Sequence, residues 1–286
     1  MADGRNKLKI HIDDEDVFQF ANWFLLAIPY EFNQDCEVLC VGFRKIIDDN
    51  FLSSFPNVKT ILSPTTAIDH IKTTRRDIKI IHLDPSSIDN INASSEFAFL
   101  LILSLLRQAG SVFRGDIVIG DDLCGKTVGI LGYGRIGKKL HKYCEVFGAN
   151  VLFHDDAFFT YSSNIYRTKE DILRESDVIV VCVSAIPENR HYIDYEDFKL
   201  MSETPYFVNI SRGFVVSDMA VIDALTTGKI RGAGLDVVES LSNYEWYNKP
   251  NLILTNHVAG STTQSRILAC NYILQKLNEE IICSNI

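Results

Sequence analysis

Short β-branched runs alternate with helical patterns along the first part of the chain. Runs typical of strands occur at residues 9–12, 38–41, 60–62 and 79–83, and residues 15–27 have a helical pattern. Alternation of this kind predicts a parallel sheet covered by helices.

A second alternating series follows a helical segment at residues 95–108 and a loop rich in Gly and Asp at residues 110–125. We expect a second α/β unit here. Its candidate strands are residues 128–131, 150–154, 178–183, 206–209, 232–235 and 252–255. The last segment, residues 262–283, predicts a helix with apolar residues near helical spacing: Ile267, Leu268, Ile273, Leu274, Leu277 and Ile281.

The second series opens with a glycine pattern that is typical of dinucleotide binding. Residues 132–137 fit G-x-G-x-x-G between a strand at 127–131 and a helix at 138–147. Gly132 permits a tight turn, Gly134 lets the backbone approach a pyrophosphate, and Gly137 lets the helix pack on the strand. Amides that open the helix, at Arg135 and Ile136, then face the phosphate charge. The alternative is a glycine-rich turn that binds nothing.

An acidic residue lies where this pattern needs one. Asp155 ends the next strand, 18 residues after Gly137, where a carboxylate can accept hydrogen bonds from both ribose hydroxyls. Asp155 and Asp156 together repel a 2′-phosphate, and no Arg follows them closely. We therefore expect NAD as cofactor and disfavour NADP.

Composition narrows the class of protein. The net charge is −9, which argues against nucleic acid and anionic lipid as partners. No apolar run reaches the length of a membrane span. The seven cysteines have no zinc or redox spacing, so we expect reduced thiols, no metal and a cytoplasmic protein.

Four stretches of the chain resemble motifs of the D-isomer-specific 2-hydroxyacid dehydrogenase family. They are residues 124–137 (the cofactor signature), 207–213 (an arginine motif), 232–237 (an aspartate motif) and 254–260 (a histidine motif). The resemblance is strong from about residue 122 to residue 262 and weaker in the first hundred residues.

The resemblance implies two doubly wound parallel-sheet domains. Residues 1–107 would be a flavodoxin-like substrate domain and residues 108–261 an inserted Rossmann NAD-binding domain, with residues 262–286 returning to the first. The active site would lie in the cleft between the domains. The reaction would move a hydride between NAD(H) and the C2 of a small 2-hydroxy or 2-oxo acid.

Each motif supplies a candidate functional residue. Arg212 is positioned by its motif to grip the substrate carboxylate, and His257 is the candidate acid/base. Asp236 and Ser184 are assigned to the cofactor, although Asp236 could instead cap the following turn. The amides of Thr66 and Ala67 would also meet the carboxylate, and the family usually has glycine in place of Ala67.

One departure from the family concerns the partner of the histidine. The family's usual Glu, five residues after the motif aspartate, is Leu241 here, and Glu239 lies two residues earlier. A deletion would let Glu239 take that role, so we include it among the catalytic candidates. A carboxylate stabilises imidazolium, and without one we expect weakened or shifted acid catalysis. The alternative function is an NAD-binding regulatory or scaffold protein of the same fold.

Two further departures affect the backbone and the assembly. Asn256 replaces the usual proline before His257, and the connection at residues 108–123 is shorter than the family's usual arm and has no tryptophan. In the family, that arm normally helps to form the dimer. We expect a homodimer despite the shorter connection.

Overall fold

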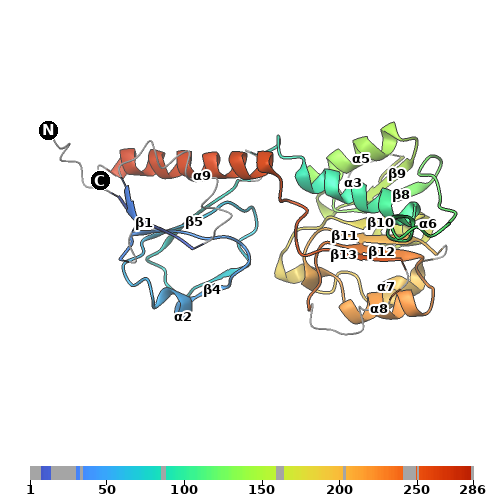
Figure 1. Ribbon diagram of the computed structural model, residues 1–286, viewed down its shortest axis with the longest axis horizontal. Coiled ribbons are helices and arrows are strands. Elements are labelled where there is room, and N and C mark those ends of the chain that lie inside the picture. The colour runs from blue at the N-terminus through green and yellow to red at the C-terminus, as the bar shows by residue number, and fades with distance from the viewer. Residues whose placement is uncertain are drawn as a thin grey trace. The chain divides into compact units, whose positions relative to one another are not determined.

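The structure, a computed structural model, describes residues 8–13, 30–32, 35–84, 88–158, 164–201, 204–240, 249 and 251–284. The chain folds into two compact units, residues 1–91 with 261–286, and residues 92–260. Each unit is built on a parallel sheet (Figure 1).

The first unit has the strand order of a flavodoxin-like sheet. Its five parallel strands lie in the order β2 (Tyr30–Phe32), β1 (Leu8–Ile12), β3 (Val38–Cys40), β5 (Thr60–Ser63) and β7 (Lys79–His82). This is the 2-1-3-4-5 order of doubly wound folds. A short ladder of β4 (Ile47–Asp48) with β6 (Ile71–Lys72), and the helix α2 (Asp49–Leu52), complete the unit. The helix expected at residues 15–27 lies outside the described residues.

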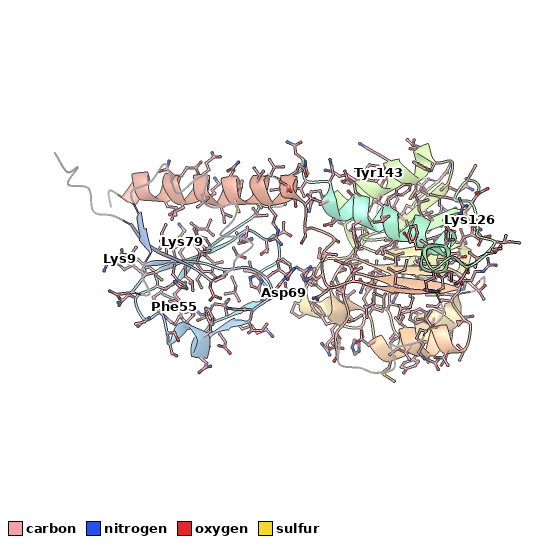
Figure 2. The ribbon with its side chains drawn as sticks, in the orientation of Figure 1. Lys9, Phe55, Asp69, Lys79, Lys126 and Tyr143 are labelled. Carbon is pink, nitrogen blue, oxygen red and sulfur yellow. The ribbon has the colours of Figure 1, made fainter. Side chains whose placement is uncertain are left out.

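The C-terminal helix α9 (Thr263–Ser284) packs on the first unit (Figure 1). Lys79 of β7, labelled in Figure 2, forms an ion pair with Glu280 of α9. Ile267 and Leu268, expected on the apolar face, are instead 43% and 41% exposed. The buried face follows helical spacing from two residues further on: Ala269, Cys270, Ile273, Leu274 and Leu277.

The second unit is a Rossmann sheet. Its strands lie in the order β9 (Asn150–His154), β8 (Thr127–Leu131), β10 (Val178–Val181), β11 (Tyr206–Asn209), β12 (Gly232–Leu235) and β13 (Leu252–Leu254). A single parallel bridge between Phe153 and Tyr166 adds one more position beside β9. With that bridge the order becomes 3-2-1-4-5-6-7, which is the 3-2-1-4-5-6 order of dinucleotide-binding sheets with β13 added at the end. Such sheets bind dinucleotides where the order reverses, here between β8 and β10.

Helices cover both faces of this sheet. Figure 1 shows α3 (Ala93–Leu106) and α5 (Arg135–Val146) on one face, and α7 (Tyr195–Leu200) and α8 (Asp218–Thr226) on the other. The helix α6 (Lys169–Glu175) packs with α7. Alternate residues of β10 enter opposite cores, since Val178 and Val180 pack with α3 and α5 while Ile179 and Val181 pack with α6, α7 and α8.

The compact units divide the chain at Asn92, where the second unit begins. The reason is the packing of α3, whose Leu101 and Leu105 lie against the backbone of Gly234 in β12. The domain boundary at residues 107–108 stays a prediction. The second unit also holds the short helix α4 (Ala109–Phe113). Within the described residues, no helix has the length and hydropathy that a membrane span requires.

Candidate active site at the carboxyl edge of the Rossmann sheet

The strands of the second unit end together, and the candidate residues follow those ends. The register aligns Val181 of β10 with Leu131 and Asn209, and Leu235 with Asn209 and Leu254. In open parallel sheets ligands bind beyond the carboxyl ends of the strands. The residues that follow these ends are Gly132, Ser184, Arg212, Asp236 and His257.

The three glycines of the turn after β8 have different surroundings. Gly132 has a φ of +97°, and a Cβ there would lie 2.7 Å from the carbonyl carbon of Cys182. A Cβ on Gly137 would lie 2.2 Å from the carbonyl oxygen of Gly132. A Cβ on Gly134 would meet nothing within 4 Å. The chain's own packing therefore requires glycine at the first and third positions, and the second faces open space.

The helix α5 begins at Arg135 directly behind that open space. Its N-cap is Gly134, which offers no side-chain hydrogen bond to the first-turn amides. Arg135 and Ile136 are half-buried. Helix N-termini attract anions through such amides and the helix dipole, so this turn fits the pyrophosphate of a dinucleotide.

Asp155, one residue beyond β9, is tied to the same turn. Its Oδ2 accepts the Tyr133 amide at 2.7 Å and its Oδ1 accepts the Ala157 amide at 2.9 Å. Each carboxylate oxygen keeps a second lone pair, so hydrogen bonds from ribose hydroxyls stay available. The Asp155 carboxylate is thus held against the glycine turn.

The ring of Tyr133 fixes the middle of the glycine turn. It stacks on Phe153 with a centroid separation of 3.7 Å, and its hydroxyl lies 2.7 Å from Nδ1 of His141. Burial lowers the pKa of His141, which favours a neutral ring that can accept the tyrosine hydroxyl. Aromatic packing therefore holds the turn from the side of the sheet.

A buried amide builds the turn that carries Arg212. Asn209, at the end of β11, is 1% exposed. Its Oδ1 accepts the Ser211 amide at 3.0 Å, and its Nδ2 donates to the Arg212 carbonyl at 3.2 Å. The Ser211 hydroxyl donates to the Val183 carbonyl at 2.6 Å. The backbone that carries the half-buried Arg212 is therefore held by hydrogen bonds to the end of β11 and to the segment after β10.

A buried carboxylate builds the turn that carries His257. Asp236 is 1% exposed, and it accepts the Thr255 hydroxyl at 2.7 Å, the Val258 amide at 2.8 Å and the Ala259 amide at 2.9 Å. Its carbonyl accepts the His257 amide at 2.8 Å. The described contacts thus give Asp236 the turn-capping role, and contact with the cofactor stays a prediction.

The backbone of His257 is left-handed, with a φ of 50°. The side chain is half-buried. A non-glycine residue in this region is uncommon and carries strain. The hydrogen bonds from the turn to Asp236 offset that strain and hold the backbone of His257 in this conformation.

Glu239 is occupied elsewhere. Its carboxylate accepts from Arg190 and lies 3.3 Å from Nε2 of His191. The hydrogen bond from Arg190 is the main reason that the pKa of Glu239 falls below its ordinary value. These contacts do not favour the expectation that Glu239 serves His257, and Leu241 lies outside the described residues.

The remaining candidates have plainer surroundings. Ser184 is exposed beyond β10. In the first unit, Thr66 and Ala67 follow β5, and the described hydrogen bonds of that loop do not engage their amides. The Thr65 hydroxyl fixes the loop by donating to the Ala67 carbonyl at 2.8 Å. The part of the chain that the structure describes holds no cluster of three His, Cys, Asp or Glu side chains suited to a metal.

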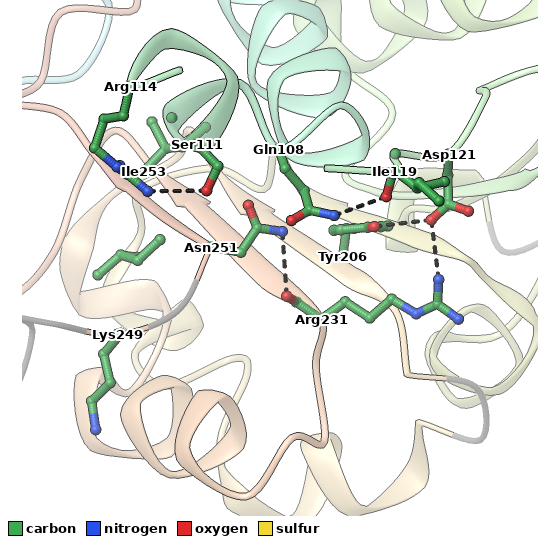
Figure 3. Close-up of a pocket in the computed structure, with 13 residues that line it drawn as sticks. Gln108, Ser111, Arg114, Ile119, Asp121, Tyr206, Arg231, Lys249, Asn251 and Ile253 are labelled. Carbon is green, nitrogen blue, oxygen red and sulfur yellow. Dashed lines mark hydrogen bonds and ion pairs between the residues drawn. The ribbon is translucent and has the colours of Figure 1, made fainter. Parts of the chain in front are cut away.

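A cavity of about 700 Å³ lies at the opposite, amino edge of the Rossmann sheet (Figure 3). Asp121 is one of the residues that line the cavity. Its carboxylate accepts a hydrogen bond from the Tyr206 hydroxyl at 3.0 Å and another from Arg231 at 3.0 Å. Sequence patterns gave no sign of this cavity, because it forms between the α4 region and the starts of β11 and β13.

Comparison with known proteins agrees with this geometry. Residues 104–259 match the family model for the NAD-binding domain of D-isomer specific 2-hydroxyacid dehydrogenases. Glyoxylate reductase of Pyrococcus furiosus is 29% identical over 266 residues, which cover 85% of this chain and 79% of that protein. Glyoxylate reductase of Thermococcus kodakarensis is 30% identical over 257 residues, which cover 82% and 76%.

The fold is shared with solved structures. D-lactate dehydrogenase from Aquifex aeolicus, solved with NAD and lactic acid, superposes with a TM-score of 0.79 at 24% identity and covers 96% of this chain and 95% of that one. The two-domain Rossmann arrangement is thus confirmed, and the match to the NAD-binding-domain model confirms NAD as the cofactor. With its parallel sheets, its glycine turn and these relatives, the chain belongs to the D-isomer specific 2-hydroxyacid dehydrogenase family.

Proposed function

We propose that this enzyme reduces a small 2-oxo acid with NADH, and that Arg212 binds the substrate carboxylate while His257 supplies the proton. The observation that carries the proposal is the construction of the two turns. Buried Asn209 and buried Asp236 fix the backbones of Arg212 and His257 beyond the same sheet edge as the glycine turn. The glyoxylate reductases among its relatives make glyoxylate the first substrate to try.

Each residue has a defined task in this proposal. A guanidinium binds a carboxylate bidentately, and an imidazole exchanges protons near neutral pH. NADH supplies the hydride when bound, and the amides at Arg135 and Ile136, with Asp155, Ser184 and Asp236, are the proposed cofactor contacts. The amides of Thr66 and Ala67 are further proposed contacts for the substrate.

The test follows NADH oxidation against glyoxylate, hydroxypyruvate and pyruvate, with NADPH in parallel. We expect turnover with NADH and a loss of about 10²–10⁴-fold in kcat for His257→Ala, the usual contribution of general acid–base catalysis. Unchanged NADH binding in that variant shows that the cofactor site is intact. Turnover that survives the substitution would remove His257 from the mechanism.

The second candidate function is an NAD-binding regulatory protein. It is favoured by Leu241 at the position of the family's Glu, together with the engagement of Glu239 by Arg190 and His191. NADH binding without turnover of any acid supports this alternative. If the enzyme is active, Leu241→Glu raises the pH limit for reduction, because a nearby carboxylate stabilises imidazolium.

We further propose a homodimer that is formed through residues 108–123. Three apolar side chains of this segment are exposed, Phe113 at 87%, Ile117 at 102% and Ile119 at 93%. Clustered exposed apolar groups mark interaction surfaces. Light scattering should give twice the 32.3 kDa chain mass, and Ile117→Asp should give the monomer.

A cytoplasmic location is also proposed. The six cysteines that the structure describes as free thiols include the exposed Cys124, and free thiols persist in reducing compartments. Fractionation of cells that produce the protein tests this location.

A further inference from the structure

Three segments meet beside the turn that carries Arg212. A Cβ on Gly213 would lie 2.2 Å from the carbonyl carbon of Val238 and 2.5 Å from the amide nitrogen of Glu239. The backbone after Arg212 therefore lies directly against the peptide that joins Val238 to Glu239. A shift of that peptide would move the turn.

The same peptide is held from the helix side by Asp218, in the first turn of α8. Its Oδ1 accepts the Glu239 amide at 3.1 Å and its Oδ2 accepts the Ser240 amide at 2.9 Å. Burial is the main cause of the raised pKa of Asp218, and the two amides oppose it. Asp218 fixes the backbone of the segment but leaves the Glu239 side chain to be fixed by other groups.

The Glu239 side chain reaches the loop at residues 190–191. Arg190 donates to one carboxylate oxygen, and Nε2 of His191 lies 3.3 Å from the other. Glu239 is 36% exposed, Arg190 56% and His191 42%. Exposed ion pairs contribute little to folding stability, so substitutions in this cluster should leave the fold intact and act on the local geometry.

The loop at residues 190–191 returns to the Arg212 turn. The His191 amide donates to the Phe214 carbonyl at 2.9 Å, and the Ile193 amide donates to the Val215 carbonyl at 3.2 Å. His191 holds a left-handed φ of 50° to make this contact. A closed ring therefore runs from Glu239 through His191 and Phe214 to Gly213 and back to the Val238–Glu239 peptide.

We propose that Glu239 is a positioning residue that fixes Arg212 through this ring, with Arg190 and His191 as its partners. The inference rests on the proposed function of Arg212 as the carboxylate-binding group. It replaces the expectation that Glu239 assists proton transfer at His257. Displacements of about 1 Å in a substrate-binding group can cost about 10²-fold in rate, so a modest shift of the turn is measurable.

The test compares Glu239→Gln with Glu196→Gln. Glu196 forms an exposed ion pair with Lys199 in α7 and is the matched control. For Glu239→Gln we expect the KM for glyoxylate to rise about three- to tenfold, with kcat changed less, because substrate binding is lost before chemistry. Arg190→Gln should do the same from the other side of the ion pair. The Kd for NADH, measured by fluorescence, should not change.

The pH profile separates positioning from acid catalysis. Arg190 keeps the pKa of Glu239 low, so Glu239 is ionised at neutral pH and the KM effect should be constant there. The pH above which the rate of glyoxylate reduction falls should be the same in Glu239→Gln as in the wild-type enzyme. A limit displaced to lower pH in Glu239→Gln would overturn the inference, because it would make Glu239 the partner of the imidazolium. Kinetics equal to those of Glu196→Gln would overturn it as well.

Arg212→Lys distinguishes this inference from the proposed function beneath it. If that variant loses glyoxylate reduction while Glu239→Gln behaves as the control does, only the positioning role fails. If Arg212→Lys keeps the wild-type KM, or the wild-type chain reduces no 2-oxo acid, the proposed function fails and the inference fails with it.

Discussion

The two edges of the Rossmann sheet use their polar side chains differently. At the carboxyl edge, buried Asn209 and Asp236 bind backbone groups of the turns that follow them. At the amino edge, the carboxylate of Asp121 joins the hydroxyl of the buried Tyr206 to Arg231 beside a wide cavity, and the side chains of Asp121 and Arg231 are partly exposed. The carboxyl edge is distinguished by turns whose backbones are fixed, and the amino edge by a large cavity. Fixed backbones are what the orientation of reacting groups requires.

The strongest test of the carboxyl edge is Gly137→Ala. The added Cβ would lie 2.2 Å from the carbonyl oxygen of Gly132, and neither backbone can yield easily. We expect the free energy of unfolding to fall by about 3 kcal/mol or more, as measured by urea denaturation. A variant with wild-type stability would show that α5 does not need its close approach to the turn.

Asp236→Asn tests the buried carboxylate. An amide nitrogen would replace one oxygen and face a backbone N–H, which leaves a buried donor unsatisfied. The expected loss is about 1–3 kcal/mol of stability, with a lower kcat because the His257 turn shifts. Urea denaturation and steady-state kinetics check both effects. Lost stability with an unchanged kcat would separate the turn from catalysis.

Gly134→Ala is the matched partner of Gly137→Ala. A Cβ at Gly134 meets nothing within 4 Å, so stability should stay within about 0.5 kcal/mol of the wild type. The methyl group would instead occupy the space proposed for the pyrophosphate, and we expect the Kd for NADH to rise about tenfold or more. Calorimetric titration with NADH measures this change, and unchanged affinity would contradict the proposed phosphate site.

At the amino edge, Asp121→Asn should have a small effect. The Arg231 and Asp121 side chains are 53% and 33% exposed, and such pairs contribute about 0–1 kcal/mol. We expect kcat/KM for glyoxylate to be unchanged. Asp121→Asn and Asp236→Asn together compare the two edges of the sheet directly. A large loss of activity in Asp121→Asn would contradict the proposed difference between the edges.

The last prediction, which involves no change in stability or activity, concerns the reactivity of two cysteine thiols. Cys124 is exposed before β8, at the amino edge, whereas burial raises the pKa of Cys144 in α5 to about 12. Because the thiolate is the reactive form, a thiol reagent at pH 8 should label Cys124 in the native protein and Cys144 only after unfolding. Mass spectrometry of the labelled peptides reports the order.

Much of the fold could be predicted from hydrophobic pattern. All six strands of the Rossmann sheet lie within a few residues of their expected positions. The central strands β8, β10, β11 and β12 are runs that are buried on both faces, whereas β9 and β13, at the edges of the sheet, are partly exposed. The strands β2, β4 and β6 were missed, because two or three residues carry no detectable period. The bridge at Tyr166 is shorter still.

The candidate site was less accessible to sequence reasoning. Spacing located the glycine turn and the strand ends, because both are local features. The pairing of Glu239 with Arg190 and His191 joins residues that are 49 and 48 positions apart, and it depends on how two loops pack. Likewise, the three hydrogen bonds accepted by Asp236 follow from the path of the turn after β13, which no motif describes.

The left-handed backbone at His257 has a consequence for how such a chain would evolve. Glycine would relieve the torsional strain at this position, which is on the order of 1 kcal/mol, so His257→Gly relaxes the loop while it removes the imidazole. Under the proposed function, a descendant released from selection for turnover would no longer need a side chain in this strained conformation. A histidine in this left-handed conformation lowers the folding stability, and natural enzymes commonly have less stable residues where activity depends on them.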